Sequence, residues 1–236
     1  MDLLGKIAMA FEHGGFWMYP IFLIQIVTIA IIVERVHALY FKRKLNQIAY
    51  VKGFEETIRR GKVEEASIAA KNQVDQYPVA SAITAGATAA LGFGGKDEIQ
   101  GKMDEALLFE TGKIEKRTAF LAVLGNVATL LGLLGTITGM IKSFAAVADA
   151  NPTAKAALLS NGISEAMNCT AYGLIVAIPA LLAYAILQNR SNEMLEDLNQ
   201  SALKVYNWLS YSFDSMASRP VVSAKSERAH SADMNA

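Results

Sequence analysis

The sequence has few of the residues from which disulfides, metal sites and covalent catalysis are built. One cysteine, Cys169, stands alone in 236 residues, so no internal disulfide can form. The three histidines lie in unrelated regions and form no metal cluster. No serine-nucleophile motif occurs, and Gly94-Gly95-Lys96 is followed by Asp97 where a phosphate-binding loop needs Ser or Thr. We therefore expect no enzyme activity, no cofactor and no metal.

Charge is also scarce. Charged residues make up 19% of the chain and the formal net charge is +0, which argues against a nucleic-acid partner. Hydrophobic residues make up 53%, which is above the usual share for soluble domains. The first fifteen residues lack a short apolar core before a small-residue cleavage site, so we expect no cleavable signal peptide.

The apolar residues gather in three uncharged runs. These runs cover residues 16–33, 119–141 and 169–187, and only Pro179 interrupts the third. Because a helix of roughly 20 apolar residues spans a bilayer, we predict membrane spans at 16–40, 118–146 and 162–188. The alternative, buried helices of a large soluble core, is disfavoured because uncharged runs of this length are rare there.

The basic residues predict the orientation of these spans. Residues 34–117 contain fourteen Lys and Arg, and the chain from Gln188 onward contains five. Because positive loops stay in the cytoplasm, we expect an outer amino terminus and an inner carboxyl terminus. The predicted parts between and beyond the spans are an amphipathic outer helix, a cytoplasmic helical domain, an outer loop, a cytoplasmic helix and a disordered tail: 1–15, 41–117, 147–161, 189–216 and 217–236.

Helical patterns extend beyond the second and third spans. The pattern at 97–117 runs into the second span without a breaker, and a second helical pattern covers 54–72. After the third span, apolar residues form one stripe: Leu195, Leu198, Ala202, Val205, Leu209 and Phe213. We therefore predict an all-α membrane protein in which two helices of about fifty residues, roughly 75 Å long, extend into the cytoplasm.

Small residues follow one face of each of these two spans. Residues at steps of four and three share a helix face. In the second span this face holds Gly125, Thr129, Gly132, Thr136, Gly139 and Ser143, with Gly135 beside it. In the third it holds Ala166, Thr170, Gly173, Ala177, Ala180 and Tyr184. Small faces let helices approach closely in lipid. The pattern fits either tight packing alone or a polar path lined by the hydroxyls of Thr136 and Thr170.

Glu165 lies one turn before the third uncharged run, near the expected outer interface. An ionisable group at such a depth is a functional candidate. The alternative is a carboxylate near a helix amino terminus, favoured by the helix dipole. Glu165 and Thr170 are five residues apart, or about 140° around a helix, so they need not face the same neighbour. No Asp or Glu lies inside the uncharged runs, so a conducted proton requires a carboxylate from another chain.

Two stretches make the sequence recognisable. Residues 132–140 (GLLGTITGM) and 163–180 (ISEAMNCTAYGLIVAIPA) resemble the second- and third-span signatures of the ExbB/TolQ/MotA proton-channel family. The three-span topology resembles ExbB and TolQ more than MotA, which has four spans. The resemblance implies an inner-membrane homo-oligomeric ring, generally a pentamer, around two single-span partners of the ExbD/TolR type. A partner aspartate would carry the proton, and by motif position Thr136 and Thr170 match the pore-lining threonines, with Glu165 as the third-span glutamate.

The resemblance leaves several questions open. It does not decide whether the motor drives a TonB-type transport protein, the Tol envelope system or a gliding apparatus. It also does not decide whether the ion is a proton or sodium. Asn168, Cys169 and Tyr172 depart from the family pattern, and a wider or wetter pore mouth would be one consequence. A non-conducting scaffold remains the alternative, in which the packing face does nothing more than hold helices together: Gly125, Gly132, Gly135, Gly139, Gly173 and Ala177. The bulky first span is expected to face lipid.

Overall fold

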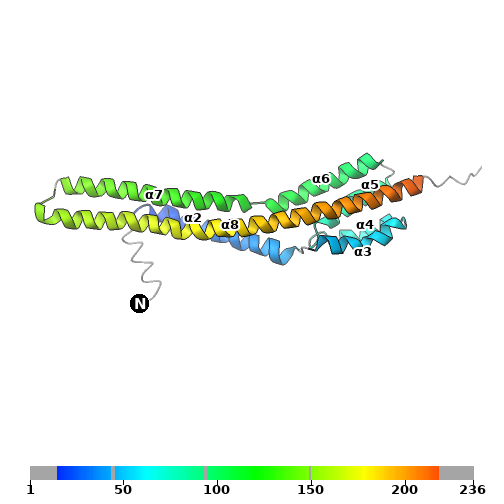
Figure 1. Ribbon diagram of the computed structural model, residues 1–236, viewed down its shortest axis with the longest axis horizontal. Coiled ribbons are helices and arrows are strands. Elements are labelled where there is room, and N and C mark those ends of the chain that lie inside the picture. The colour runs from blue at the N-terminus through cyan, green and yellow to red at the C-terminus, as the bar shows by residue number, and fades with distance from the viewer. Residues whose placement is uncertain (1–14, 44–45, 93–94, 149, 218–236) are drawn as a thin grey trace, which may run out of the picture. The chain divides into compact units, whose positions relative to one another are not determined.

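The computed structural model describes residues 15–43, 46–92, 95–148 and 150–217. The predicted outer helix at 1–15 and tail at 217–236 fall almost wholly outside these residues. Every regular element in the described part is helical, as predicted: α2 Met18–Val36, the π-helix η1 His37–Lys42, α3 Gln47–Arg59, α4 Val63–Lys71, α5 Val79–Leu91, α6 Lys96–Glu115, α7 Thr118–Ala148 and α8 Pro152–Ala217 (Figure 1). The chain divides into two compact units, one of Met1–Phe41 with Glu115–Asn192 and one of Lys42–Ile114 with Glu193–Ala236.

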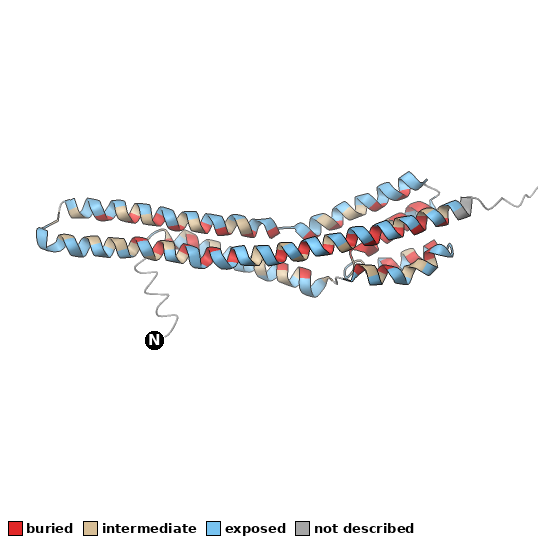
Figure 2. Ribbon diagram, in the orientation of Figure 1, coloured by how far each residue is buried: buried red, intermediate tan, exposed pale blue. Residues whose placement is uncertain are grey.

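The first unit holds three helices that are long and apolar enough to cross a membrane, α2, α7 and the first part of α8. Their outward sides carry many exposed large apolar side chains, and Figure 2 shows much of these helices as exposed. Examples are Leu23, Ile29, Leu130, Ile141, Ile175 and Leu182. A soluble core would bury such residues. Their exposure argues against the soluble alternative and matches helices whose surroundings are lipid or other membrane helices.

Helix α8 is one uninterrupted helix of 66 residues, about 100 Å long. Pro179 lies inside it without ending it, which membrane helices tolerate better than soluble ones. The helix starts at Pro152, a residue favoured at the first helical position, and the Asn151 carbonyl accepts from the backbone N–H groups of Ala154 and Lys155. Most of the predicted loop at 147–161 is therefore helical, because α7 extends to Ala148 and α8 begins at Pro152.

The prediction that one helix runs from residue 97 through the second span is wrong. Helix α6 ends at Glu115 and α7 begins at Thr118. Between them Arg117 has φ 62°, a left-handed conformation that costs a non-glycine residue roughly 1–2 kcal/mol. The Arg117 guanidinium pairs with Glu34 of α2 at 2.5 Å, and Thr118 is fully buried. No Gly or Pro marks this break, so the local sequence does not reveal it.

The second unit is a helical bundle with its own core. Gly61, at φ 80°, divides the predicted helix at 54–72 into α3 and α4. Helix α5 is buried on most sides, and an ideal Cβ on Gly86 would lie 2.7 Å from Met103 Sδ of α6 and 2.9 Å from Leu209 Cδ1 of α8. The apolar stripe predicted for α8 is confirmed, with its four central residues buried: Leu198, Ala202, Val205 and Leu209.

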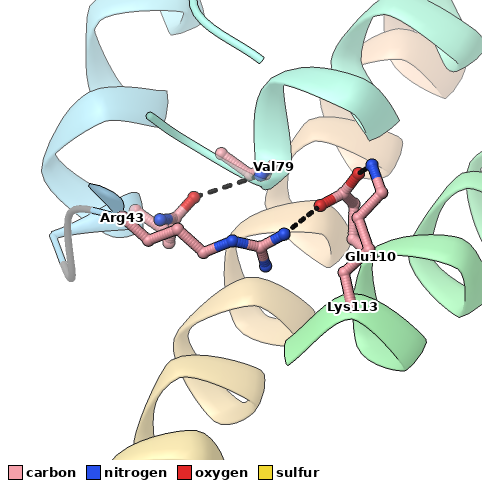
Figure 3. A network of polar contacts seen from close by, with 5 residues as sticks. Arg43, Val79, Glu110 and Lys113 are labelled. Carbon is pink, nitrogen blue, oxygen red and sulfur yellow. Dashed lines mark hydrogen bonds and ion pairs between the residues drawn. The ribbon is translucent and has the colours of Figure 1, made fainter. Parts of the chain in front are cut away.

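A buried charge network ties the start of this unit to α6 (Figure 3). The Glu110 side chain is 3% exposed and accepts from Arg43 Nη2 at 3.1 Å and from Lys113 Nζ at 2.6 Å. Beside it, Gln47 Oε1 accepts from the Val79 backbone N–H at 3.1 Å. Loss of solvation lowers the pKa of Arg43, and the adjacent Glu110 carboxylate opposes that effect.

Tyr50 provides a stability test within the second unit. Its ring stacks on the ring of Tyr77, with the two ring centroids 4.0 Å apart. Its buried hydroxyl has no hydrogen-bond partner among the described residues. Burial raises the pKa of Tyr50 from 10.0 to about 12. The folded state therefore holds the hydroxyl proton of Tyr50 more tightly than the unfolded state does. The stabilisation that follows from this pKa difference is complete below pH 10 and is lost as the pH rises towards 12.

We expect Tyr50→Phe to preserve the free energy of unfolding at neutral pH, or to raise it by about 1 kcal/mol, because no hydrogen bond is lost. Ultraviolet absorbance titration of the two proteins should differ by one tyrosine ionising near pH 12. A difference signal centred near pH 10 would contradict the burial argument.

Candidate functional site

Helices α7 and α8 contact each other through their glycines. An ideal Cβ on Gly139 would lie 3.2 Å from Ala166 Cα, one on Gly132 would lie 3.2 Å from Thr170 Cα, and one on Gly125 would lie 3.0 Å from Leu181 Cγ. In these three contacts, a lower residue number on α7 pairs with a higher residue number on α8, so the two helices are antiparallel neighbours (Figure 1). The absent side chains are what allow this close approach.

Helix α2 packs against the same pair. Ile21 lies in a buried cluster with Ala128, Cys169, Val176 and Ala177, and Trp17 packs against that cluster. Cys169 is 1% exposed and faces Gly135, where an added Cβ would overlap its Sγ. Tyr172 donates its hydroxyl hydrogen to Gln25 Oε1 of α2. Packing within one chain therefore accounts for both Cys169 and Tyr172, two of the three departures from the family pattern, while Asn168 is half-buried.

The threonines and the glycines of the small-residue faces separate in the structure. Gly125, Gly132 and Gly139 are buried in the contact, whereas Thr136 and Thr170 are half-buried at its edge. The Thr170 hydroxyl donates to the Gly132 carbonyl at 2.8 Å and so links the two helices. The Thr136 hydroxyl donates to the Leu133 carbonyl at 2.6 Å within α7. The two hydroxyls thus bind backbone carbonyls of adjacent residues.

These hydrogen bonds determine which further hydrogen bonds the two hydroxyls can form. A threonine hydroxyl has one hydrogen to donate and two lone pairs that accept. Both hydrogens are already donated to carbonyls. What Thr136 and Thr170 can still offer is therefore an acceptor, suited to water, to a protonated carboxyl group or to a cation.

Glu165 is half-buried on α8 and lies thirteen residues after the helix begins at Pro152. The helix-dipole explanation for this carboxylate is wrong, because that effect falls off within the first turn. Its carboxyl group lies over Gly15, in the turn that leads into α2. Thr170 instead faces α7. The two residues contact different neighbours, as their 140° separation on the helix allows.

Sequence reasoning missed two residues of this region, Gly15 and Gln25. Gln25 had a usable signal, because it is an amide within an otherwise apolar run and such groups hydrogen-bond to neighbouring membrane helices. Gly15 had none, because its contact with Glu165 joins residues far apart in the chain. Among the described residues, no group of three or more His, Cys, Asp or Glu could hold a metal ion.

In the described residues, the fold has three apolar helices that are long enough to cross a membrane, and two of them form a tightly packed pair with threonine hydroxyls at its edge. Fold and site together thus fit a membrane protein. Residues 74–200 match the MotA/TolQ/ExbB proton channel family, and the chain belongs to this family. This confirms the resemblance identified from the two signature stretches.

Individual relatives carry both family names. The biopolymer transport protein ExbB of Salmonella typhimurium is 30% identical over 194 residues, which cover 72% of this chain and 78% of that protein. The Tol-Pal system protein TolQ of Haemophilus influenzae is 38% identical over 95 residues, 40% of this chain and 41% of that protein. The TolQ of Pseudomonas aeruginosa is 41% identical over 93 residues, 39% of each chain. The chain thus matches only about two fifths of either TolQ protein.

Proposed function

We propose that this protein is the ring-forming subunit of a proton-driven motor in the bacterial inner membrane. Five copies would surround two single-span partners of the ExbD/TolR type, each bringing an aspartate. Proton flow through the ring would drive work on the envelope, through a TonB-type or Tol-type protein. The amino terminus would lie outside and the carboxyl terminus in the cytoplasm, as the Lys and Arg distribution favours.

The hydrogen-bonding state of Thr136 and Thr170 carries this proposal. Both hydroxyls offer acceptors at the edge of the α7–α8 contact, and the uncharged runs contain no carboxylate. An acceptor stabilises a protonated carboxyl group, which can donate, better than a carboxylate, which only accepts. The threonines would therefore favour the protonated partner aspartate while it passes through the membrane, and the partner would supply the titrating group.

Proton flux into vesicles that contain this protein and its partner tests the proposal. We expect Thr136→Val and Thr170→Val each to lower flux roughly tenfold, since one lost hydrogen bond of about 1.4 kcal/mol corresponds to that factor. Thr170→Ser keeps the hydroxyl and should retain flux. Thr138→Val is the matched control, because Thr138 lies on α7, donates to the Leu134 carbonyl at 3.0 Å, and is not among the proposed path residues.

A non-conducting scaffold is the second candidate. One observation favours it: packing contacts within a single chain are enough to explain why α7 has glycine at these positions. If the protein is only a scaffold, flux and motor output should persist unchanged in both valine variants. The proton-path function requires them to fall together while Thr138→Val stays unchanged. Replacing protons with sodium ions in the same vesicles distinguishes the two candidate ions.

A further inference from the structure

The carboxyl group of Glu165 lies against Gly15, a residue that has no side chain to displace it. An ideal Cβ on Gly15 would overlap Glu165 Oε1 and would lie 3.2 Å from Cδ and 3.6 Å from Cγ. Gly15 also has φ 71°, a conformation that L-residues with a side chain rarely adopt. Two separate features, the backbone conformation and the contact, thus require glycine here.

The turn that carries Gly15 is anchored on its far side. The Gly15 carbonyl accepts from the Met18 backbone N–H at 3.3 Å, and Met18 and Ile21 are fully buried. Trp17 packs against the cluster that contains Cys169, and its Cβ would lie 3.5 Å from a Cβ on Gly135. The turn therefore cannot move away from α8 without unpacking the start of α2.

The backbone that carries Glu165 is anchored as well. Ala166, the next residue, packs against Gly139, and Cys169, one turn later, packs against Gly135. Rotation of α8 would break both contacts. With both backbones held, only the side-chain torsions of Glu165 remain adjustable, and the bare Cα of Gly15 leaves room for the conformation observed.

We propose that Gly15 is a positioning residue for Glu165, so that the turn into the first membrane helix sets where the carboxyl group at the outer end of the proton path lies. The inference rests on the proposed function for the role of Glu165 and on the contact geometry for the role of Gly15. A side chain at position 15 would push a flexible carboxyl end aside, leaving the helix packing in place.

Proton flux by the complex with its partner tests this inference in a pairwise comparison. Gly15→Ala and Gly15→Asn should each lower flux about tenfold and shift its pH profile; Asn tolerates the left-handed backbone, so it adds a Cβ with less strain. Glu165→Asp has a carboxyl group one methylene shorter, so its oxygens would lie near the position of Glu165 Cδ, 3.2 Å from the added Cβ, instead of overlapping it. Gly15→Ala should therefore lower flux much less in the Glu165→Asp background than in the parent.

Gly61→Ala is the matched control for backbone strain. Gly61 has φ 80°, and a Cβ there would meet nothing within 4 Å. We expect Gly61→Ala and Gly15→Ala to lower thermal stability by similar amounts, but Gly61→Ala should leave the pH profile of flux unchanged. An equal loss of flux in Gly61→Ala, or an equal effect of Gly15→Ala in both Glu165 backgrounds, would overturn the positioning role.

An infrared measurement separates failure of this inference from failure of the proposed function. The carboxyl bands of Glu165 are those that disappear in Glu165→Gln, and they should shift in Gly15→Ala but not in Gly61→Ala. If the bands shift while Glu165→Gln leaves flux unchanged, the role of Glu165 in the proton path is overturned and the contact stands. If the bands do not shift, the positioning role is overturned whatever the flux.

Discussion

Gly173→Ala should lower the free energy of unfolding by roughly 3 kcal/mol and lower the thermal midpoint of the protein in detergent. The three atoms nearest to an added Cβ are all backbone: Ala128 O at 2.7 Å, Gly132 Cα at 3.1 Å and Gly132 N at 3.4 Å. Backbone atoms cannot rotate away as a side chain can. The whole of α7 would have to move away from α8, and the hydrogen bond from Thr170 to Gly132 would lengthen.

Gly101→Ala is the control for this prediction. Gly101 lies inside α6, and a Cβ there would meet nothing within 4 Å. Alanine is favoured over glycine inside a helix by roughly 0.5–1 kcal/mol, so this variant should raise stability. Opposite signs for the same chemical change would demonstrate that close helix approach is the cause, whereas equal shifts would refute it.

Glu110→Ala should destabilise the second unit by about 3–5 kcal/mol, because it leaves the largely buried Arg43 guanidinium without its carboxylate. The Nη1 atom of Arg43 is already buried with no hydrogen-bond partner among the described residues. Removing both charges should restore part of the loss, so Arg43→Leu combined with Glu110→Leu should be more stable than Glu110→Leu alone. Chemical unfolding followed by circular dichroism measures each difference.

Glu105→Ala is the control on the same helix. Glu105 pairs with Lys102 at 2.9 Å, but its side chain is 72% exposed. Surface pairs of this kind contribute roughly 0–1 kcal/mol, so the loss should be small. A loss for Glu105→Ala as large as that for Glu110→Ala would mean that burial is not what makes the Glu110 network important.

The sequence predicted the helical architecture well where one pattern runs long. No helix-breaking residue separates the third uncharged run from the apolar stripe between Leu195 and Phe213, and α8 is accordingly one helix across both. The same reasoning failed for the second span, because the break at Arg117 uses an ordinary charged residue in a left-handed conformation. Contacts of Arg117 and Thr118 with the rest of their unit accompany that break, and local propensity does not include them.

The candidate site was predictable as a set of faces but not as a set of contacts. Spacing identified the small residues of both helices, and it separated Glu165 from Thr170 around α8. Spacing could not reveal that Thr170 donates to Gly132 while Thr136 donates within its own helix. It also suggested a helix-end position for Glu165, which the start of α8 at Pro152 excludes.

By itself, the sequence determined three apolar helices, the two small-residue faces and the two signature stretches of the family, because periodicity and composition are local properties of the chain. Only the tertiary structure decided which neighbour each face meets. It set Gly132 against Thr170, Cys169 against Gly135, and the carboxyl group of Glu165 against Gly15. The physical reason is that these contacts join residues at least thirty positions apart, and packing between helices, rather than the pattern along any one of them, selects the partners.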